Sequence, residues 1–227
     1  RMPDPLFARQ QSGARRKFAS DASLHTVVRR PPRRYRRTAM NDATQITMAA
    51  SLPARFSMAE FMPIAALARS RGINLELSQG VLVRKSPALG KHMRLQREIF
   101  EALAAVYFDT AHKPLVQFEL SLQFGDDTLR NVDVGVTREV PPDEGFGDPA
   151  HVLLAVEVAL STLNDDLGGK LRDYASAGIP NYWVVDATRN CTQVLTVPLD
   201  GDYAERRLVP FGQTLLVPGT DRTIIIA

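Results

Sequence analysis

Three charged residues have types and positions that could support hydrolytic chemistry. Asp133 and Glu157 each stand in a mostly apolar run typical of a strand, and Lys170 lies in the segment after the second run. Two carboxylates on neighbouring strands can hold a hard divalent cation through oxygen ligands. Such an ion activates water, and a nearby lysine can orient that water or balance developing charge. The pattern favours metal-assisted hydrolysis of a phosphodiester; a buried ion pair without chemistry is the alternative.

Glu157 is the only charged residue in the run Val152–Leu160. A short apolar run bounded by turn residues is typical of a strand that is covered on both faces. A carboxylate buried there costs several kcal/mol unless it is paired or binds a metal. The alternative is that Glu157 stands at the end of the strand and points past the edge of the sheet. The residues alone do not separate these two interpretations.

The elements that must position these side chains follow from periodicity and turn signals. Ser57 and Glu60 form a capping box that predicts a helix ended by Gly72. Apolar periods predict a second helix over 90–108 and a third between 161 and 178. Alternation and turn residues predict strands over 74–77, 81–84, 116–124, 129–136, 152–160, 181–186, 192–197, 203–209, 214–217 and 223–226.

The third predicted helix carries Lys170 on the edge of its apolar stripe. Leu167, Leu171 and Tyr174 recur at helical spacing, which favours a packing role for Tyr174. Asp166 lies four residues before Lys170, so these two side chains could form only a helical ion pair. Tyr182 and Trp183 are likewise interpreted as packing residues, and Glu119 as a polar-face residue of its strand.

His92 shares the inward face of the second predicted helix with Leu95 and Ile99. A lone histidine on such a face is more often a core residue than a ligand. The densest basic cluster outside the first 50 residues surrounds it and consists of Arg84, Lys85, Lys91, Arg94 and Arg97. A solvated face is the simplest interpretation of this cluster, and a rim that contacts phosphates is the functional one.

Composition limits the class of protein. A chain of 227 residues is long enough for one domain with a real core. The single cysteine, Cys191, excludes an internal disulfide framework and suits a reducing cytoplasm. No run of about 18 apolar residues occurs, so we expect no membrane span.

The basic net charge belongs to the first part of the chain. Residues 1–40 contain eleven Arg or Lys against two Asp, whereas residues 41–227 contain 17 basic against 23 acidic residues. We expect residues 1–50 to be a disordered basic leader, followed by one domain over 51–227. Because the first residue is Arg1, the leader could be absent from the native protein, with Met40 or Met48 as the start. A nucleic-acid-binding arm and a transit peptide are the other interpretations.

Several of these residues also carry a family resemblance. The sequence resembles the Uma2 family of restriction endonucleases, a bacterial branch of the PD-(D/E)XK nuclease superfamily. The resemblance covers about residues 55–220, and its most specific part is Ala-Gly-Ile-Pro-Asn-Tyr-Trp-Val-Val-Asp at 177–186. It also rests on the hairpin around 75–83 and on Ser86, Pro87, His92, Asp133, Glu157, Val158, Ser161, Thr162, Asp166, Lys170 and Tyr174.

The resemblance implies a fold, a site and a cofactor. The fold is α/β (α+β): a restriction-endonuclease-like mixed β-sheet flanked by helices, with extra C-terminal antiparallel strands. Asp133 and Glu157 would be metal ligands for Mg²⁺ or Mn²⁺, Lys170 the catalytic lysine, and Glu76 a further acid. The substrate would be DNA and the source a bacterium, and homodimers are common among such nucleases.

Two departures from the superfamily pattern leave a second function open. Val132 stands where the superfamily usually has proline, which mainly affects backbone stiffness. Ala159 stands two residues after Glu157, where a lysine is common; in this branch the following helix supplies it, which makes Lys170 the candidate. The alternative to a metal-dependent endonuclease is therefore a catalytically degenerate module that binds DNA or a protein. A nuclease acting on RNA or branched DNA would use the same chemistry.

Overall fold

The computed structural model describes residues 54–85, 90–108, 110 and 114–227. The predicted basic leader lies outside these residues. Residues 50–227 form a compact unit of their own. In the part of the chain that is described, no helix is long and apolar enough to cross a membrane.

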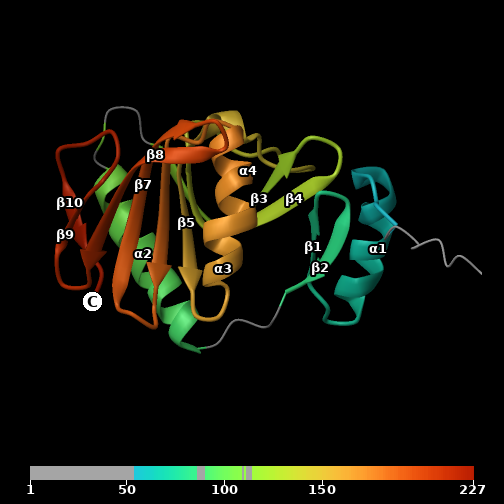
Figure 1. The fold of residues 1–227 in the computed structure, drawn as a ribbon, viewed down its shortest axis with the longest axis horizontal. Helices are drawn as coiled ribbons and strands as arrows, with labels where there is room; N and C mark the ends of the chain where they lie inside the picture. The colour runs from blue at the N-terminus through green and yellow to red at the C-terminus, as the bar shows by residue number, and fades with distance from the viewer. Residues whose placement is uncertain (1–53, 86–89, 109, 111–113) are drawn as a thin grey trace, which may run out of the picture. The chain divides into compact units, whose positions relative to one another are not determined.

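One mixed sheet organises this unit (Figure 1). Its strand order is β2-β1-β4-β5-β6-β7-β8, and β3 pairs with β4. Strands β5 and β6 are parallel, and the other pairs are antiparallel. The strands are β1 (Leu75–Ser78), β2 (Val81–Arg84), β3 (Leu115–Phe124), β4 (Thr128–Thr137), β5 (Val152–Ala159), β6 (Asn181–Asp186), β7 (Cys191–Leu199) and β8 (Asp202–Pro210). A separate hairpin pairs β9 (Thr214–Leu216) with β10 (Thr223–Ile225).

The helices begin and end close to the predicted residues. Helix α1 (Met58–Ser70) opens with the predicted capping box, in which Glu60 Oε2 accepts from the Ser57 amide at 2.9 Å. Helix α2 covers Gly90–Phe108. A 3₁₀ turn, η1 (Pro149–His151), precedes β5. Between β5 and β6 lie α3 (Leu163–Asp165), η2 (Asp166–Lys170) and α4 (Leu171–Ser176).

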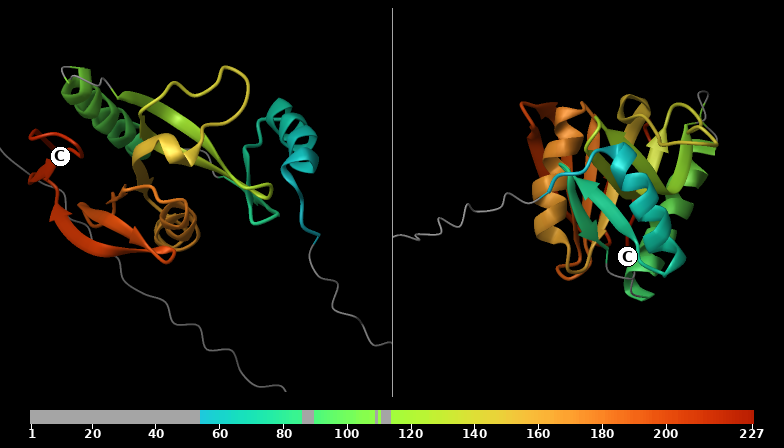
Figure 2. Two further views of the ribbon diagram at one scale, coloured as in Figure 1. Left: turned by 90° about the horizontal axis from the view of Figure 1, so that it is seen from above. Right: turned by 90° about the vertical axis from the view of Figure 1, so that its right-hand side faces the viewer.

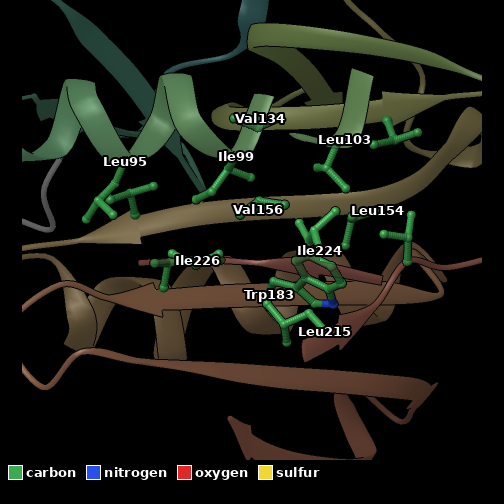
Figure 3. Close-up of a cluster of buried hydrophobic side chains, with 14 of the residues drawn as sticks. Leu95, Ile99, Leu103, Val134, Leu154, Val156, Trp183, Leu215, Ile224 and Ile226 are labelled. Atoms are coloured by element: carbon green, nitrogen blue, oxygen red, sulfur yellow. The ribbon is translucent and has the colours of Figure 1, made fainter. Parts of the chain in front are cut away.

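Helices cover both faces of the central strands. Helix α2 lies on one face, where its apolar stripe packs against β4, β5, β6 and the β9–β10 hairpin around Trp183 (Figure 3). On the other face, α4 packs against alternate residues of β5 and β6. Seen from above, β7 and β8 curl around α4 (Figure 2), and the Tyr203 hydroxyl donates to the Ile179 carbonyl at 2.9 Å. Both faces of the central strands are buried, which explains why their sequences are nearly continuous apolar runs.

Strand β4 forks away from β5 along one of its edges. The two strands pair from Thr137 with Val152 to Val134 with Val156. Further along the same strand, Leu129 pairs instead with Leu77 of β1. On the opposite edge, β3 has Glu119 at a φ of 47°, between the pairs Phe118–Val134 and Leu120–Val132. A left-handed φ is uncommon for a residue with a side chain, so β3 is locally distorted at the level of β4 where pairing with β5 ends.

The segment after β5 differs from the predicted continuous α-helix. Its middle, η2, is π-helical. A π-helical turn holds more residues than an α-helical one, so it rotates the side chains that follow relative to an α-helical pattern. Lys170 is the last residue of this turn, and only 1% of its side chain is exposed.

Candidate active site

Asp133 occupies the fork between β4 and β5. It is the next residue along β4 after the last pair with β5. Its Oδ2 accepts from the backbone N–H of Val158 at 2.7 Å, so the side chain supplies the acceptor that the diverging strand no longer offers. The Asp133 side chain is 19% exposed. The fork thus fixes one carboxylate oxygen and leaves the other, Oδ1, facing His92.

Glu157 is buried in β5, as the first of the two interpretations of its strand predicts. Its side chain is 2% exposed and points to the face that α4 covers. Oε1 accepts from the Tyr174 hydroxyl at 2.6 Å, and Oε2 lies 2.6 Å from Lys170 Nζ. Both oxygens are therefore held by side chains from the segment between β5 and β6.

Lys170 reaches Glu157 from the end of the π-helical turn. Its Nζ also lies 3.5 Å from Asp166 Oδ1, which is the predicted helical ion pair. Asp166 is itself fixed, because its Oδ2 accepts from the Thr162 hydroxyl at 2.6 Å. The turn therefore directs one ammonium group towards two carboxylates.

The charges around Lys170 explain the proton affinities of the site. Burial raises the pKa of Glu157 to about 8, although Lys170 opposes this shift. Burial also raises the pKa of Asp166. Burial alone would lower the pKa of Lys170, but Glu157 and other nearby carboxylates raise it above its ordinary value. Burial is thus the main cause of both carboxyl shifts, whereas the neighbouring carboxylates cause the shift of Lys170.

His92 borders the exposed side of the site. Its Nε2 lies 3.4 Å from Asp133 Oδ1, and its Nδ1 lies 2.9 Å from the carbonyl oxygen of Val158. The hydrogen bond with Asp133 raises the pKa of His92. Although burial opposes ionisation of Asp133, His92 and Lys170 lower the pKa of this carboxyl group. The imidazole is thus a partner of the candidate site and not simply a core residue.

Glu76 joins a neighbouring charged network. Its Oε1 accepts from the Asn131 amide at 3.1 Å and lies 3.3 Å from Lys85 Nζ. Its Oε2 has no hydrogen bond and lies 3.8 Å from Nη1 of the buried Arg130. Arg130 also contacts Asp173 of α4, with Nη2 2.7 Å from Oδ2. Glu76 contributes to the field at Lys170, but its direct partners are Arg130, Lys85 and the β4 backbone.

The most exposed members of the site are Asp133 and His92, whose side chains are 19% and 17% exposed. A hollow of about 660 Å³ opens elsewhere, and its lining includes Phe124, Asp148 and Asp173 but neither Asp133 nor Glu157. In the described residues, no group of three or more His, Cys, Asp or Glu side chains is arranged to hold a metal ion.

Two carboxylates nevertheless fit a hard cation such as Mg²⁺. This ion keeps several waters and binds proteins through one or two carboxylates. Asp133 Oδ1, which faces His92, would be one oxygen ligand. The buried Glu157 would share an oxygen that now bonds to Lys170 or Tyr174.

The structure brings three of the four predicted residues into one site and adds others. Asp133, Glu157 and Lys170 meet at the fork, and Glu76 stands beside it. Tyr174 packs as predicted, but its hydroxyl also bonds to Glu157, a role that helical periodicity does not reveal. Arg130 was not singled out from the sequence, although a lone arginine within the strand Thr128–Thr137 is a detectable signal.

Fold and site together define the class of protein. A mixed sheet flanked by helices, with carboxylates on two strands that diverge, is a restriction-endonuclease-like arrangement. A solved structure from Anabaena variabilis, described as "a putative nuclease", has 17% sequence identity and a TM-score of 0.55; the match covers 75% of this chain and 95% of that one. This similarity confirms the predicted fold.

The family match is more direct. Residues 58–224 match the Uma2 family, whose description is "Putative restriction endonuclease". The chain belongs to this family, as the resemblance predicted. A search of curated proteins found no match. Family and fold together support a nuclease.

Proposed function

We propose that this protein is a metal-dependent endonuclease that hydrolyses phosphodiester bonds of DNA. The observation that carries the proposal is the burial of Lys170 against Glu157, with Nζ 2.6 Å from Oε2 at the fork that Asp133 occupies. A lysine that served only a binding surface would point to solvent. Keeping this buried charge is costly, so its placement at two carboxylates favours a catalytic role.

Each residue has a distinct task in this proposal. Asp133 and Glu157 would hold Mg²⁺ or Mn²⁺. When bound, the ion would polarise a phosphoryl oxygen and acidify water. Lys170 acts as a donor and not as a base, because the surrounding carboxylates raise its pKa and keep it protonated. It orients the attacking water or balances the charge that develops as the P–O ester bond breaks. Glu76 helps indirectly, through its field at Lys170.

The substrate and the setting are parts of the same proposal. Lys85 is close enough to His92 to oppose the rise in its pKa that Asp133 causes, and Lys91 is the exposed residue that precedes His92 in α2. Basic side chains beside the site suit a phosphate backbone. DNA is the substrate that the family description favours, and RNA or branched DNA would suit the same chemistry. We further propose a bacterial, cytoplasmic protein that acts as a homodimer.

Cleavage of supercoiled plasmid tests the proposal. The full chain is incubated with plasmid and Mg²⁺, Mn²⁺ or EDTA, beside the near-isosteric variants Glu157→Gln and Asp133→Asn. We expect nicking that needs the metal and falls at least about a hundredfold in either variant. Glu139→Gln is the matched control, because Glu139 is an exposed acid whose partner is His151. It should cleave like the parent.

Other outcomes have defined meanings. Nicking that persists in Glu157→Gln would show that another site or a contaminant cleaves the plasmid. If neither plasmid nor RNA nor branched DNA is cut, the degenerate binding module becomes the better interpretation. That second candidate is favoured by one observation: both Glu157 oxygens are already occupied by Tyr174 and Lys170.

A further inference from the structure

His92 presents its two ring nitrogens to two different strands. Nδ1 lies 2.9 Å from the Val158 carbonyl oxygen. Because a carbonyl oxygen can only accept, Nδ1 carries the hydrogen in this bond. In the neutral ring, the lone pair of Nε2 then faces Asp133 Oδ1 at 3.4 Å. Two electron-rich atoms that face one another in this way need a positive charge between them, which is either a proton on Nε2 or a metal ion.

The separation of these two atoms suits a shared metal ion. Bonds from a small divalent ion to nitrogen or oxygen are about 2.0–2.2 Å long. Two ligands of one such ion are therefore about 3.0 Å apart at octahedral angles and about 3.4 Å apart at tetrahedral angles. The distance from Nε2 to Oδ1 lies at the upper end of this range.

The first turns of α2 hold the imidazole in place. Gln96, four residues after His92, donates from Nε2 to the backbone carbonyl of Asp133 at 2.8 Å. Lys91 donates to the carbonyl of Ala187. Together with the bond from His92 to Val158, these contacts fix α2 to β4, to β5 and to the residue that follows β6. A ring nitrogen bonded to a backbone carbonyl is the usual support of a metal-binding histidine.

We propose that His92 Nε2 is a direct ligand of the divalent ion, together with Asp133. This inference rests on the proposed function, because the ion is the same one. It adds a nitrogen donor to the two carboxylates. Since nitrogen ligands favour Mn²⁺ and later first-row ions over Mg²⁺, we expect the site to bind Mn²⁺ more tightly than Mg²⁺. The competing arrangement is an imidazolium ion paired with Asp133, which would keep a metal out.

Metal binding without DNA separates these arrangements. Mn²⁺ and Mg²⁺ are titrated by calorimetry into the full chain, and bound Mn²⁺ is examined by pulsed electron paramagnetic resonance. We expect nitrogen coupling from a directly bound imidazole in the parent and none in His92→Asn. The affinity of this variant for Mn²⁺ should fall about tenfold or more, and its affinity for Mg²⁺ by less.

A matched control is available on the surface. His151 Nδ1 lies 3.5 Å from Glu139 Oε1, an imidazole–carboxylate pair outside the site. His151→Asn should leave both affinities and the nitrogen coupling unchanged. If His92→Asn lowers the melting temperature in EDTA, His92→Gln serves as the second variant. It keeps a longer side chain but can bind the ion only through oxygen, so the coupling should still vanish.

Two results would overturn the inference: a parent–Mn²⁺ complex without nitrogen coupling, or variants that bind Mn²⁺ as tightly as the parent or more tightly. Metal-dependent nicking without nitrogen coupling would remove His92 as a ligand but keep the endonuclease. Nitrogen coupling in a protein that cuts no nucleic acid would keep the ligand and reject the endonuclease. Absence of Mn²⁺ binding would reject both.

Discussion

At the scale of single residues, Glu157 depends on the two side chains that hold its oxygens. Lys170 supplies a charge and Tyr174 a neutral donor. An unpaired carboxylate in this position would lose hydration without compensation. The tyrosine hydroxyl also fixes the direction of the carboxylate, which matters if the other oxygen is to meet a metal ion.

Replacing Tyr174 by phenylalanine should therefore affect both stability and activity. The change removes the donor to Glu157 Oε1 and keeps the ring that packs against Tyr182 at a centroid distance of 5.0 Å. We expect the free energy of unfolding in urea to fall by about 1–3 kcal/mol, because a buried acceptor loses its partner. Metal-dependent cleavage should fall as well.

Tyr203→Phe is the control for this change. It also removes a buried hydroxyl, but one that bonds to the Ile179 carbonyl and not to a site residue. It should lower the stability by a similar amount and leave cleavage at the parent rate. Equal activity losses in both variants would show that Tyr174 acts only through general stability.

The charged residues of the site could be predicted because they stand in apolar stretches of the sequence. Their hydrogen-bond partners could not be predicted. Glu157 was conspicuous because it is the one charge in a buried run. His92 and Tyr174 lie on inward helical faces, where periodicity predicts packing and gives no information about hydrogen bonds. Their roles depend on which strand they face, and this is determined only by the tertiary fold.

At the scale of elements, the π-helical turn and the strand fork place the charges. Helix and strand positions followed from caps, turns and apolar periods to within one or two residues, because these signals are local. The π-helical turn has no such signal. Lys170 is buried at the end of this turn, where it pairs with Glu157. This ion pair offsets the free-energy cost of the irregular backbone. The fork depends on β1, which is distant in sequence from β5.

Two adjacent glycines of this turn offer a test. A Cβ atom on Gly169 would lie 3.1 Å from both Arg130 Nη2 and Asp165 Oδ1, whereas one on Gly168 would meet nothing within 4 Å. Arg130 cannot easily move, because it bonds to Asp173 and Ser78. We expect Gly169→Ala to lower the free energy of unfolding in urea by about 1–3 kcal/mol through this overpacking.

Gly168→Ala is the matched control and should change the stability by less than about 1 kcal/mol, in the stabilising direction, because alanine restricts the unfolded chain. If the two variants unfold at the same urea concentration, a Cβ atom at position 169 does not disturb the packing of Arg130.

At the scale of the whole molecule, metal binding and folding should be linked. A ligand that binds only the folded state raises its melting temperature. The ligand oxygens belong to β4 and β5 at the centre of the sheet, so an ion at the fork would join strands that no longer pair with each other there. Stabilisation by Mn²⁺ should therefore appear in the unfolding of the whole unit.

The pH dependence of this stabilisation follows from Glu157. Its pKa is raised to about 8, so below pH 8 a proton must leave before the carboxylate can bind a metal ion. The raised pKa of His92 acts in the same direction. The shift in melting temperature caused by Mn²⁺ should therefore grow from pH 6 to pH 8, with an affinity gain of up to about tenfold per pH unit per proton released.

The same titration distinguishes the source of the protons. Calorimetry in two buffers of different ionisation enthalpy should detect proton release on Mn²⁺ binding at pH 7. Asp133→Asn should lose the Mn²⁺-induced stabilisation at every pH. In Glu157→Gln, any remaining binding should release fewer protons, because the amide does not titrate. A shift in melting temperature that stays constant from pH 6 to pH 8 would mean that Glu157 is already ionised in the free protein, held so by Lys170 against its burial.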